Sequence, residues 1–424
     1  MRTLAALLAS LALAGPARAE RTLGLDEALA LAGQANRDLA TARERIAQAE
    51  ADVGAARARL LPSLTAQARY LRNEEEIAFP LGPVVVTLQP LEQLSASATV
   101  TVPLLAPPTW AGLSAAAHGR DAAAATFDAT RSELLLAVAQ AFYGSAGADE
   151  AVAARREATA VTGRTLENAR TRLAAGAASP VEVTRAELAT VQAGQALAEA
   201  DDARAHAYRA LATLVQLREP FRVAPGELAV APPDPLDALT ARALRARPEL
   251  RALREAVAAR EAAVAAVDLR WAPTVAAFGT ATASDPAGMA GKTSTWLAGV
   301  QLDWSLFDGG ARFAERRRAS SQLREARLQL ERAADAVGDE VADRSRAVET
   351  KRSGVAAAER GVVLASQTLD VVRTQYEAGT VAQIELLQAQ DALVNARVGL
   401  ARARFDLAVA DLQLRRSLGE PAGA

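Results

Sequence analysis

The apolar positions of this chain follow a helical repeat over most of its length and a strict alternation in four short segments. The clearest helical repeat follows Thr380, where leucines recur every seven residues and alanines lie three residues after the first four leucines. These positions are Leu386, Leu393, Leu400, Leu407 and Leu414, with Ala389, Ala396, Ala403 and Ala410. A large residue at one seam position and a small one at the other lets two helices approach closely along their whole length. The pattern predicts one rod of a coiled coil.

The helical pattern stops and restarts at residues 377–385. Gly379 sits where the residue after a helix must take a positive φ, and Thr380 with Gln383 forms a T-x-x-Q capping box for the helix that follows. This segment is therefore predicted to be the tip of a helical hairpin.

A second tip is predicted at residues 174–182. Ser179 is the expected N-cap, Pro180 occupies the first helical position and Glu182 closes a capping box. Gly176 lies 203 residues before Gly379 (379 − 176). At that offset four alanines fall on the four heptad alanines; they are Ala186, Ala193, Ala200 and Ala207. The chain is therefore a tandem duplication.

A second set of positions supports the duplication. Pro62 and Pro273 are 211 residues apart (273 − 62), and that offset also aligns Glu44 with Glu255. We expect the eight residues by which the two offsets differ (211 − 203) in the long segment between about residues 72 and 93. The predicted division is a first repeat over residues 20–218, a proline-rich surface linker over 219–236, a second repeat over 237–419 and a tail over 420–424.

Proline placement marks out unusually long helices. No proline occurs between Pro108 and Pro180 or between Pro286 and Pro421, and good helix formers fill both intervals. The first interval predicts a helix from about residue 109 to 175, which at 1.5 Å per residue is on the order of 100 Å long. Such a helix has no globular core around it and must pack against neighbouring helices.

Four segments alternate between apolar and polar residues, which predicts strands with one face of each kind. They lie at about residues 64–72, 94–105, 274–282 and 295–307, with Phe278 and Leu297 off the pattern. Strands of about ten residues are long enough to cross a bilayer when tilted. Aromatic residues near the strand ends, as in interfacial girdles, favour the membrane over the alternative of a small periplasmic sheet packed on the helices.

Four strands are too few to close a barrel. Open strand edges are not tolerated in lipid, because each unpaired backbone group costs several kcal/mol. Several chains must therefore share one barrel: two would give eight strands, and three would give twelve and leave a lumen. The sequence alone does not choose between them. The connections at about residues 72–93, which hold the acidic triplet 74–76, and 285–292 would be the extracellular loops.

The N-terminal segment has the features of a secretory signal peptide over residues 1–19. Arg2 supplies the positive charge, Leu4 to Ala14 the apolar run, and an A-x-A site predicts cleavage before Glu20. The apolar run is too short to span a bilayer, and no later stretch offers 18 or more consecutive apolar residues. We therefore expect an exported protein without a transmembrane helix.

The composition excludes several kinds of chemistry. The chain has no cysteine, which excludes disulfides and thiolate metal sites, and its net charge of −2 gives no reason to expect a nucleic-acid partner. It has no phosphate-binding loop, G-x-S-x-G elbow or H-E-x-x-H motif, so neither an enzyme nor a cofactor is predicted. For His118 and His206 we identify no acidic cluster at i+3 or i+4 spacing, and we expect solvated or inter-helix roles instead of a metal site.

The two tips, the Y-x-x-G-T stretch at residues 376–380 and the closing Leu-Arg-Arg-Ser-Leu-Gly at residues 414–419 resemble the TolC family of outer-membrane efflux proteins. The resemblance covers nearly the whole mature chain in order. It implies a mainly α fold with a transmembrane β part. Three protomers would share a 12-stranded barrel in the outer membrane, continued across the periplasm by an α-helical tunnel.

The resemblance also assigns residues to a periplasmic gate. In the family, the inner hairpin ends close the mouth with a ring of acids and with a tyrosine that bonds an acid on the other hairpin. Tyr376 matches that tyrosine, Glu182 its acidic partner and Glu385 the first ring carboxylate. Gln388 stands in place of a second ring acid and Val381 in place of a closing arginine, which implies a weaker cation filter and a looser lock. The alternative is that Glu182 only caps a helix and Tyr376 only packs in a seam.

The resemblance places the helical hairpins of a periplasmic membrane-fusion adaptor on the tips, at Gly176, Ala177, Gly379 and Thr380. The implied function is a passive export conduit, a homotrimer in outer-membrane lipid that docks on this adaptor and on an inner-membrane transporter of a tripartite efflux or type I secretion system. An alternative from another class is a soluble periplasmic coiled-coil scaffold, which the amphipathic strands disfavour. Among channels, dedicated protein secretion is the alternative to drug or metal efflux.

Overall fold

The computed structural model describes residues 21–81, 84–226, 230, 232–287 and 292–420. These residues form two compact units, one built from residues 41–127 and 248–334 and the other from the remaining segments. We call them the sheet unit and the hairpin unit. The predicted signal peptide lies outside the described residues, as do residues 421–424 of the predicted tail. Within the described part of the chain, no helix combines the length and the apolar content needed to cross a membrane.

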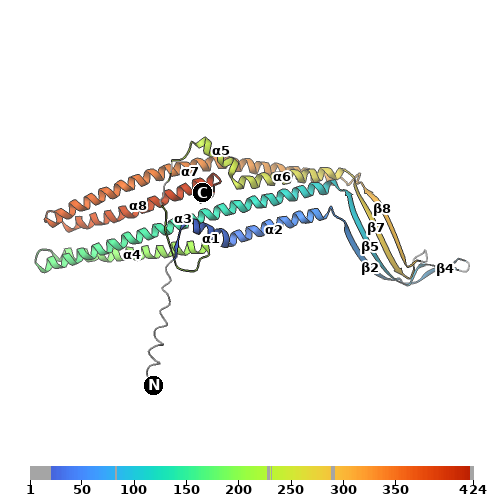
Figure 1. The fold of residues 1–424 in the computed structure, drawn as a ribbon, viewed down its shortest axis with the longest axis horizontal. Coiled ribbons are helices and arrows are strands. Elements are labelled where there is room, and N and C mark those ends of the chain that lie inside the picture. The colour runs from blue at the N-terminus through green and yellow to red at the C-terminus, as the bar shows by residue number, and fades with distance from the viewer. Residues whose placement is uncertain (1–20, 82–83, 227–229, 231, 288–291, 421–424) are drawn as a thin grey trace, which may run out of the picture. The chain divides into compact units, whose positions relative to one another are not determined.

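The sheet unit is organised by four antiparallel strands. In the order β2-β5-β7-β8, they are β2 (Ser63–Arg72), β5 (Glu92–Leu105), β7 (Thr274–Asp285) and β8 (Ser294–Asp303) (Figure 1). The sequence predicted the last strand to continue to residue 307. It ends four residues earlier, because Asp303 pairs with Thr274, the first residue of β7, and the described chain has no strand to pair with beyond that point. The next residue, Trp304, instead donates its indole N–H to the carbonyl of Trp271 at 3.0 Å.

The strand register gathers the apolar positions of all four strands on one face of the sheet. Leu64 pairs with Val100, and Ala277 with Val300, so that apolar residues face their own kind across each ladder. Large side chains on this face are open to solvent in the single chain: Trp296 is 81% exposed and Leu64 72%. An exposed apolar face of this extent requires a partner or an apolar solvent.

The two residues off the alternating pattern lie on the opposite, polar face. Phe278 pairs with Gly299, and a Cβ built on that glycine would lie 3.3 Å from the Phe278 ring. The ring therefore covers the space that the glycine leaves empty. Leu297 pairs with Thr280, the next polar-face position along β7.

The connection between β2 and β5 contains a hairpin that the sequence did not predict. Its strands are β3 (Ile77–Leu81) and β4 (Val84–Gln89), and residues 82–83 lie outside the described residues. Ser63 pairs with Thr101, 38 residues later (101 − 63), whereas its repeat counterpart Thr274 pairs with Asp303, 29 residues later (303 − 274). The extra length of the first repeat therefore lies in this connection.

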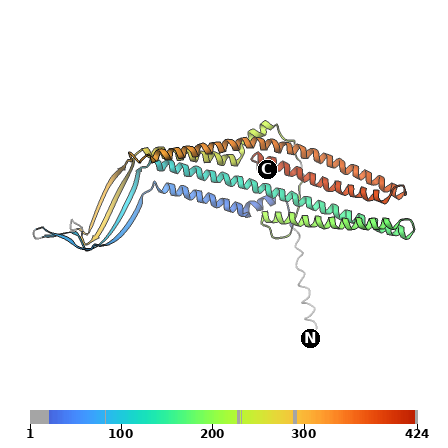
Figure 2. The ribbon, with the colours of Figure 1, turned by 180° about the vertical axis from the view of Figure 1, so that it is seen from behind.

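Helices continue directly from the sheet. They are α2 (Arg37–Ala58), α6 (Pro248–Asp268) with the short 3₁₀ helix η1 (Leu269–Trp271), and the first parts of α3 (Pro107–Ala174) and α7 (Ala311–Glu377). β5 runs into α3, and α6 leads through η1 into β7. Because β5 and β7 are paired, α3 and α6 lie side by side although they come from different repeats (Figure 2).

The hairpin unit contains the remaining parts of α3 and α7 and four further helices. These are α1 (Leu25–Ala35), α4 (Pro180–Val215), α5 (Leu236–Ala246) and α8 (Gln383–Ser417). α3 turns back into α4, and α7 turns back into α8. The predicted linker is not wholly irregular, since it holds β6 (Phe221–Val223), which pairs in parallel with β1 (Arg21–Leu23).

Polar contacts fix β6 against the helices. The Tyr208 hydroxyl donates to Asp149 at 2.5 Å and accepts from the Val223 N–H at 3.3 Å, and Arg204 pairs with the same aspartate. Burial, together with the hydrogen bond to Asp149, raises the pKa of Tyr208. The phenol therefore remains a proton donor to the aspartate at neutral pH and holds the strand to α4 and α3.

Matching contacts at the ends of the two repeats reflect the duplication. Asn36, between α1 and α2, donates its side-chain amide to the Leu214 carbonyl at 3.4 Å. Arg247, between α5 and α6, donates Nε to the Ser417 carbonyl at 2.5 Å. The two donors are 211 residues apart (247 − 36) and the two acceptors 203 (417 − 214), which are the two offsets found in the sequence. In each repeat, a hydrogen bond thus joins the junction between the first two helices to the C-terminal end of the last helix.

α8 buries more than its heptad seam. Leu386, Leu393 and Leu414 of the seam are buried, as predicted, and Leu400 and Leu407 are half-buried. A second buried stripe runs along the C-terminal half of the helix through Ala401, Phe405, Ala408 and Leu412. Phe405 packs with Ala146 and Tyr143 of α3. α8 therefore packs against the other hairpin as well as against its own partner.

Candidate functional site

The first tip has the predicted geometry. Gly176 follows α3 with a φ of +74°, and the Ala177 N–H donates back to the Arg172 carbonyl at 2.8 Å, which closes the helix end. On the other side of the turn, the Glu182 carboxylate accepts the Ser179 N–H at 3.2 Å and completes the capping box of α4. Gly176 and Ala177 are exposed at the turn.

The second tip ends its first helix in the same way but begins the next one differently. Gly379 has a φ of +75°, and the Thr380 N–H donates to the Gln375 carbonyl at 2.9 Å. The predicted T-x-x-Q capping box is wrong: α8 begins at Gln383, Ala382 is its N-cap, and no side chain caps it. The Thr380 hydroxyl instead donates to the Gln375 carbonyl at 2.9 Å, so it caps the helix that ends and not the one that starts.

The two ring positions lie one turn apart on the open side of α8. Glu385 and Gln388 are exposed, whereas Leu386, Leu387 and Ala389 between and beside them are buried. The i, i+3 spacing places the two polar side chains on one face, away from the packed leucines. The Glu385 carboxylate is therefore open to solvent in the single chain.

The structure does not join Tyr376 to Glu182. Within the described residues, the Glu182 carboxylate bonds Ser179 of its own turn, and the Tyr376 ring lies against Arg172 of the other hairpin. The Arg172 guanidinium carbon is 4.9 Å from the ring centre, a cation–π distance, and Nη2 donates to the Ala177 carbonyl at 3.4 Å. Arg172 thus links the two tips, and sequence reasoning missed it because no spacing rule connects positions on separate hairpins.

Near the tips, two amide side chains of α8 are fully or partly buried. Gln383 is 2% exposed, and neither its amide oxygen nor its nitrogen has a protein partner among the described residues. Seven residues further along α8, Gln390 donates to the Thr165 hydroxyl on α3 at 3.4 Å. These amides give the tip end of α8 a polar character, in contrast to the apolar contact around Phe405 in its C-terminal half.

Both histidines lie beside an acid, contrary to the prediction. Asp121 lies three residues after His118 on α3, and Asp202 lies four residues before His206 on α4, so each histidine has an acid at helical spacing. His206 Nε2 is 3.5 Å from Asp202. His118 is joined in addition by Glu255 of α6, which makes it the one histidine of the described chain within a group of three possible metal ligands.

Comparison with known proteins decides the family. The model of the outer membrane efflux protein family matches residues 28–215 and 239–420, most of the chain in two segments. The chain belongs to this family. The soluble-scaffold alternative has no support, and the protein is located in the outer membrane.

This chain is similar in sequence to known outer membrane efflux proteins and similar in fold to solved outer membrane channels. The chain is 29% identical over 273 residues to the outer membrane efflux protein BepC of Brucella suis, with 63% of this chain and 59% of BepC covered. It is 31% identical over 296 residues to the protein CyaE of Bordetella pertussis, with 68% and 62% covered. The matched segments thus span about three fifths of these relatives. The fold matches the Campylobacter jejuni CmeC outer membrane channel with a TM-score of 0.79 at 16% identity, over 93% of this chain and 85% of CmeC.

Proposed function

We propose that this protein is the outer-membrane channel-tunnel of a tripartite efflux or type I secretion system. It is a passive conduit that docks on a periplasmic adaptor and receives its cargo from an inner-membrane transporter. It performs no chemistry on that cargo. Drugs, metals and exported proteins are all cargo classes of such a system.

The observation that carries this proposal is the apolar face of the four-stranded sheet. β2 and β8 are the edges of the sheet, and no strand of the described residues lies beside their outer backbone groups. In lipid these groups need partners, and the edges of neighbouring chains supply them. Three chains then give a barrel of twelve strands with a lumen, and the helices that continue from each strand form the tunnel wall.

The tips support docking of the adaptor. Gly176, Ala177, Gly379 and Thr380 are exposed, and both glycines have a positive φ that a larger side chain would strain. These small residues leave the backbone of both turns accessible to the helical hairpins of an adaptor.

The gate is the place where conduction is expected to be controlled. In a trimer, three copies of Glu385 would form a single acidic ring near the channel axis. A second acidic ring is not expected, because the corresponding residue is the uncharged Gln388. In a narrow mouth, a ring of carboxylates favours cations over anions. The channel is therefore expected to be cation-selective, and multivalent cations should block its conductance only weakly.

Planar-bilayer recordings of the purified protein test this proposal. Glu385→Gln should lower the preference for cations and remove the block by multivalent cations, because it removes the three ring charges. Glu76→Gln, in the connection between β2 and β5, is the matched control and should change neither property. Absence of conductance would overturn the channel itself. Equal behaviour of the two variants would show that Glu385 does not line the narrowest part of the pore.

A further inference from the structure

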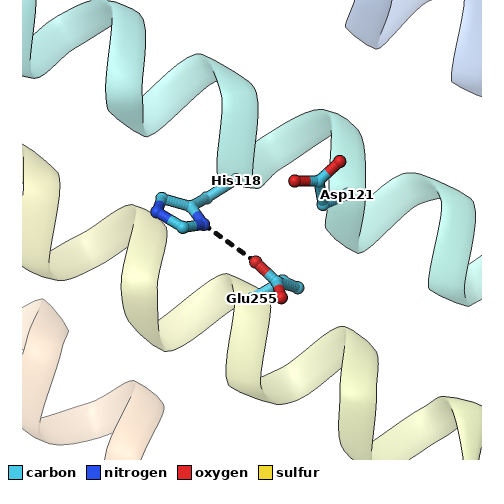
Figure 3. A group of neighbouring side chains, drawn as sticks. All are labelled: His118, Asp121 and Glu255. Carbon is cyan, nitrogen blue, oxygen red and sulfur yellow. Dashed lines mark hydrogen bonds and ion pairs between the residues drawn. The ribbon is translucent and has the colours of Figure 1, made fainter.

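Three possible metal ligands converge in the sheet unit, outside the gate. His118 and Asp121 lie on α3, and Glu255 lies on α6 (Figure 3). One ligand atom from each of the three side chains lies within 4.8 Å of the other two. His118 Nδ1 is already 2.8 Å from Glu255 Oε2. We infer that this group binds a divalent transition-metal cation of the zinc type, which bridges α3 and α6.

The sequence and topology explain why these side chains meet. The i, i+3 spacing puts the histidine and the aspartate on one face of α3, as in the carboxylate–histidine pairs that build metal sites inside helical bundles. The pairing of β5 with β7 places α6 beside α3, and Glu255 projects from it toward that face. Two ligands therefore come from the first repeat and one from the second.

The ligand set suits zinc. One imidazole nitrogen and two carboxylate oxygens are three ligands that Zn²⁺ accepts, and water can supply the fourth. With metal–ligand bonds of about 2.1 Å, a tetrahedral site needs ligand atoms roughly 3.4 Å apart. Side-chain rotations that move the ligand atoms by on the order of 1 Å would bring the outlying atoms to this separation. His118 Nδ1 and Glu255 Oε2, which are now hydrogen-bonded, would have to move apart by less than about 1 Å. Entry of the cation is not obstructed, since these two side chains are 38% and 31% exposed.

Asp121 is oriented by a neighbour. Arg120 donates Nε and Nη2 to Asp121 Oδ1, at 3.0 and 2.7 Å. This pair holds one oxygen of the carboxylate in place and leaves Oδ2 for a cation, as the groups that support metal ligands commonly do. The Arg120 guanidinium also competes with the cation for the negative charge of Asp121. The affinity for the cation is therefore lower than at the same site without the arginine.

The duplicated position does not carry the group. At the 211-residue offset Glu255 corresponds to Glu44, but at the 203-residue offset His118 and Asp121 correspond to Ser321 and Arg324. A serine and a cation in these places cannot complete the same site. The proposed site is therefore present once per chain and is not a general feature of the helix pairs.

Metal titration of the full mature protein in detergent tests the inference. After removal of metals with a chelator, calorimetry should show one saturable Zn²⁺ site per chain. His118→Ala, Asp121→Asn and Glu255→Gln should each weaken binding at least tenfold. His206→Ala is the matched control and should leave the affinity unchanged. It removes the other histidine, which also lies beside an aspartate but has no third possible ligand among the described residues.

A second readout separates a real site from scattered surface binding. Co²⁺ should give visible absorption bands that disappear in His118→Ala and persist in His206→Ala. Size-exclusion chromatography confirms that each variant keeps the elution volume of the wild type. The inference is overturned if the wild type shows no saturable binding, or if the two histidine variants behave alike in either measurement. The result is independent of transport activity, so it stands or falls separately from the proposed channel.

Discussion

At the scale of single residues, Gly147 of α3 lies where the ring of Phe405 crosses the helix. A Cβ on Gly147 would lie 2.8 Å from Phe405 Cδ2 and 3.3 Å from Cε2, closer than carbon atoms pack. Phe405 is only 9% exposed and is held by Ala146, Ala401 and Tyr143, so its ring has little room to move. Because Gly147 has no Cβ, α3 and α8 can approach each other closely at this position.

We therefore predict that Gly147→Ala destabilises the folded protein by about 1–3 kcal/mol, the range for overpacking a core. Gly144→Ala, three residues earlier on the same helix, is the control. A Cβ there would meet no atom of the described residues within 4 Å, so the substitution should be neutral or stabilise by up to ~1 kcal/mol through helix propensity. Thermal unfolding of the purified variants compares them. Shifts of the same sign would show that the Phe405 ring moves away freely.

The tip glycines and Gly147 differ in how far the sequence reveals their role. Gly176 and Gly379 end helical patterns, and a positive φ at such a place is a local requirement that the sequence shows directly. Gly147 lies in the middle of a helix, and its role depends on a residue 258 positions away (405 − 147). For the same reason the sequence did not show the contact of Arg172 with Tyr376. Roles that depend on a distant partner are not visible in local patterns.

At the scale of elements, the two hairpins are joined near their tips by the Arg172–Tyr376 contact. Both side chains are half-buried, and a cation–π contact that remains near water contributes about 0.5–1 kcal/mol. If it holds the tips together in the closed channel, Arg172→Ala should raise the ratio of open to closed dwell time about two- to fivefold, which corresponds to that free energy. Single-channel recordings measure the ratio directly.

Arg170→Ala is the control for this prediction. Arg170 lies on the same helix end and faces Glu187 at 3.7 Å within its own hairpin, so its loss removes a similar charge without uncoupling the hairpins. Arg172→Lys should behave nearly like Arg172→Ala, since an ammonium stacks less well on a ring than a planar guanidinium. An equal effect of Arg170→Ala would assign the change to net charge at the mouth and not to the contact.

The elements themselves were predictable to different degrees. The long helices and the strand starts followed from proline placement and alternation, and β2 and β7 begin within one residue of expectation. The end of β8 did not follow, because it is set by where β7 begins and not by its own apolar residues. β3 and β4 were missed because Pro80 and the neighbouring glycine and proline signalled a loop. The second buried stripe of α8 was hidden beneath the stronger heptad pattern.

At the scale of the whole molecule, we expect the two edge strands of the described sheet, β2 and β8, to pair with other chains. We predict an obligate trimer, because β2 and β8 of one chain can pair only with edges of its neighbours and three chains leave a lumen. Mass measurement of the detergent-solubilised protein should give three times the mass of the mature chain, with no monomer that retains its strands. A stable folded monomer would contradict the shared barrel.

The near-equal helix lengths of the two repeats limit how this protein can change its size. α3 and α7 have 68 and 67 residues, and α4 and α8 have 36 and 35. One inserted residue turns everything beyond it by about 100° and carries the tip residues off their faces. Seven residues bring the face back to within about 20° and add roughly 10 Å. A gain or loss of seven codons in each of the four helices therefore changes the length of the protein and keeps the tip residues on their faces. Related genes can adapt to periplasms of different width by such steps.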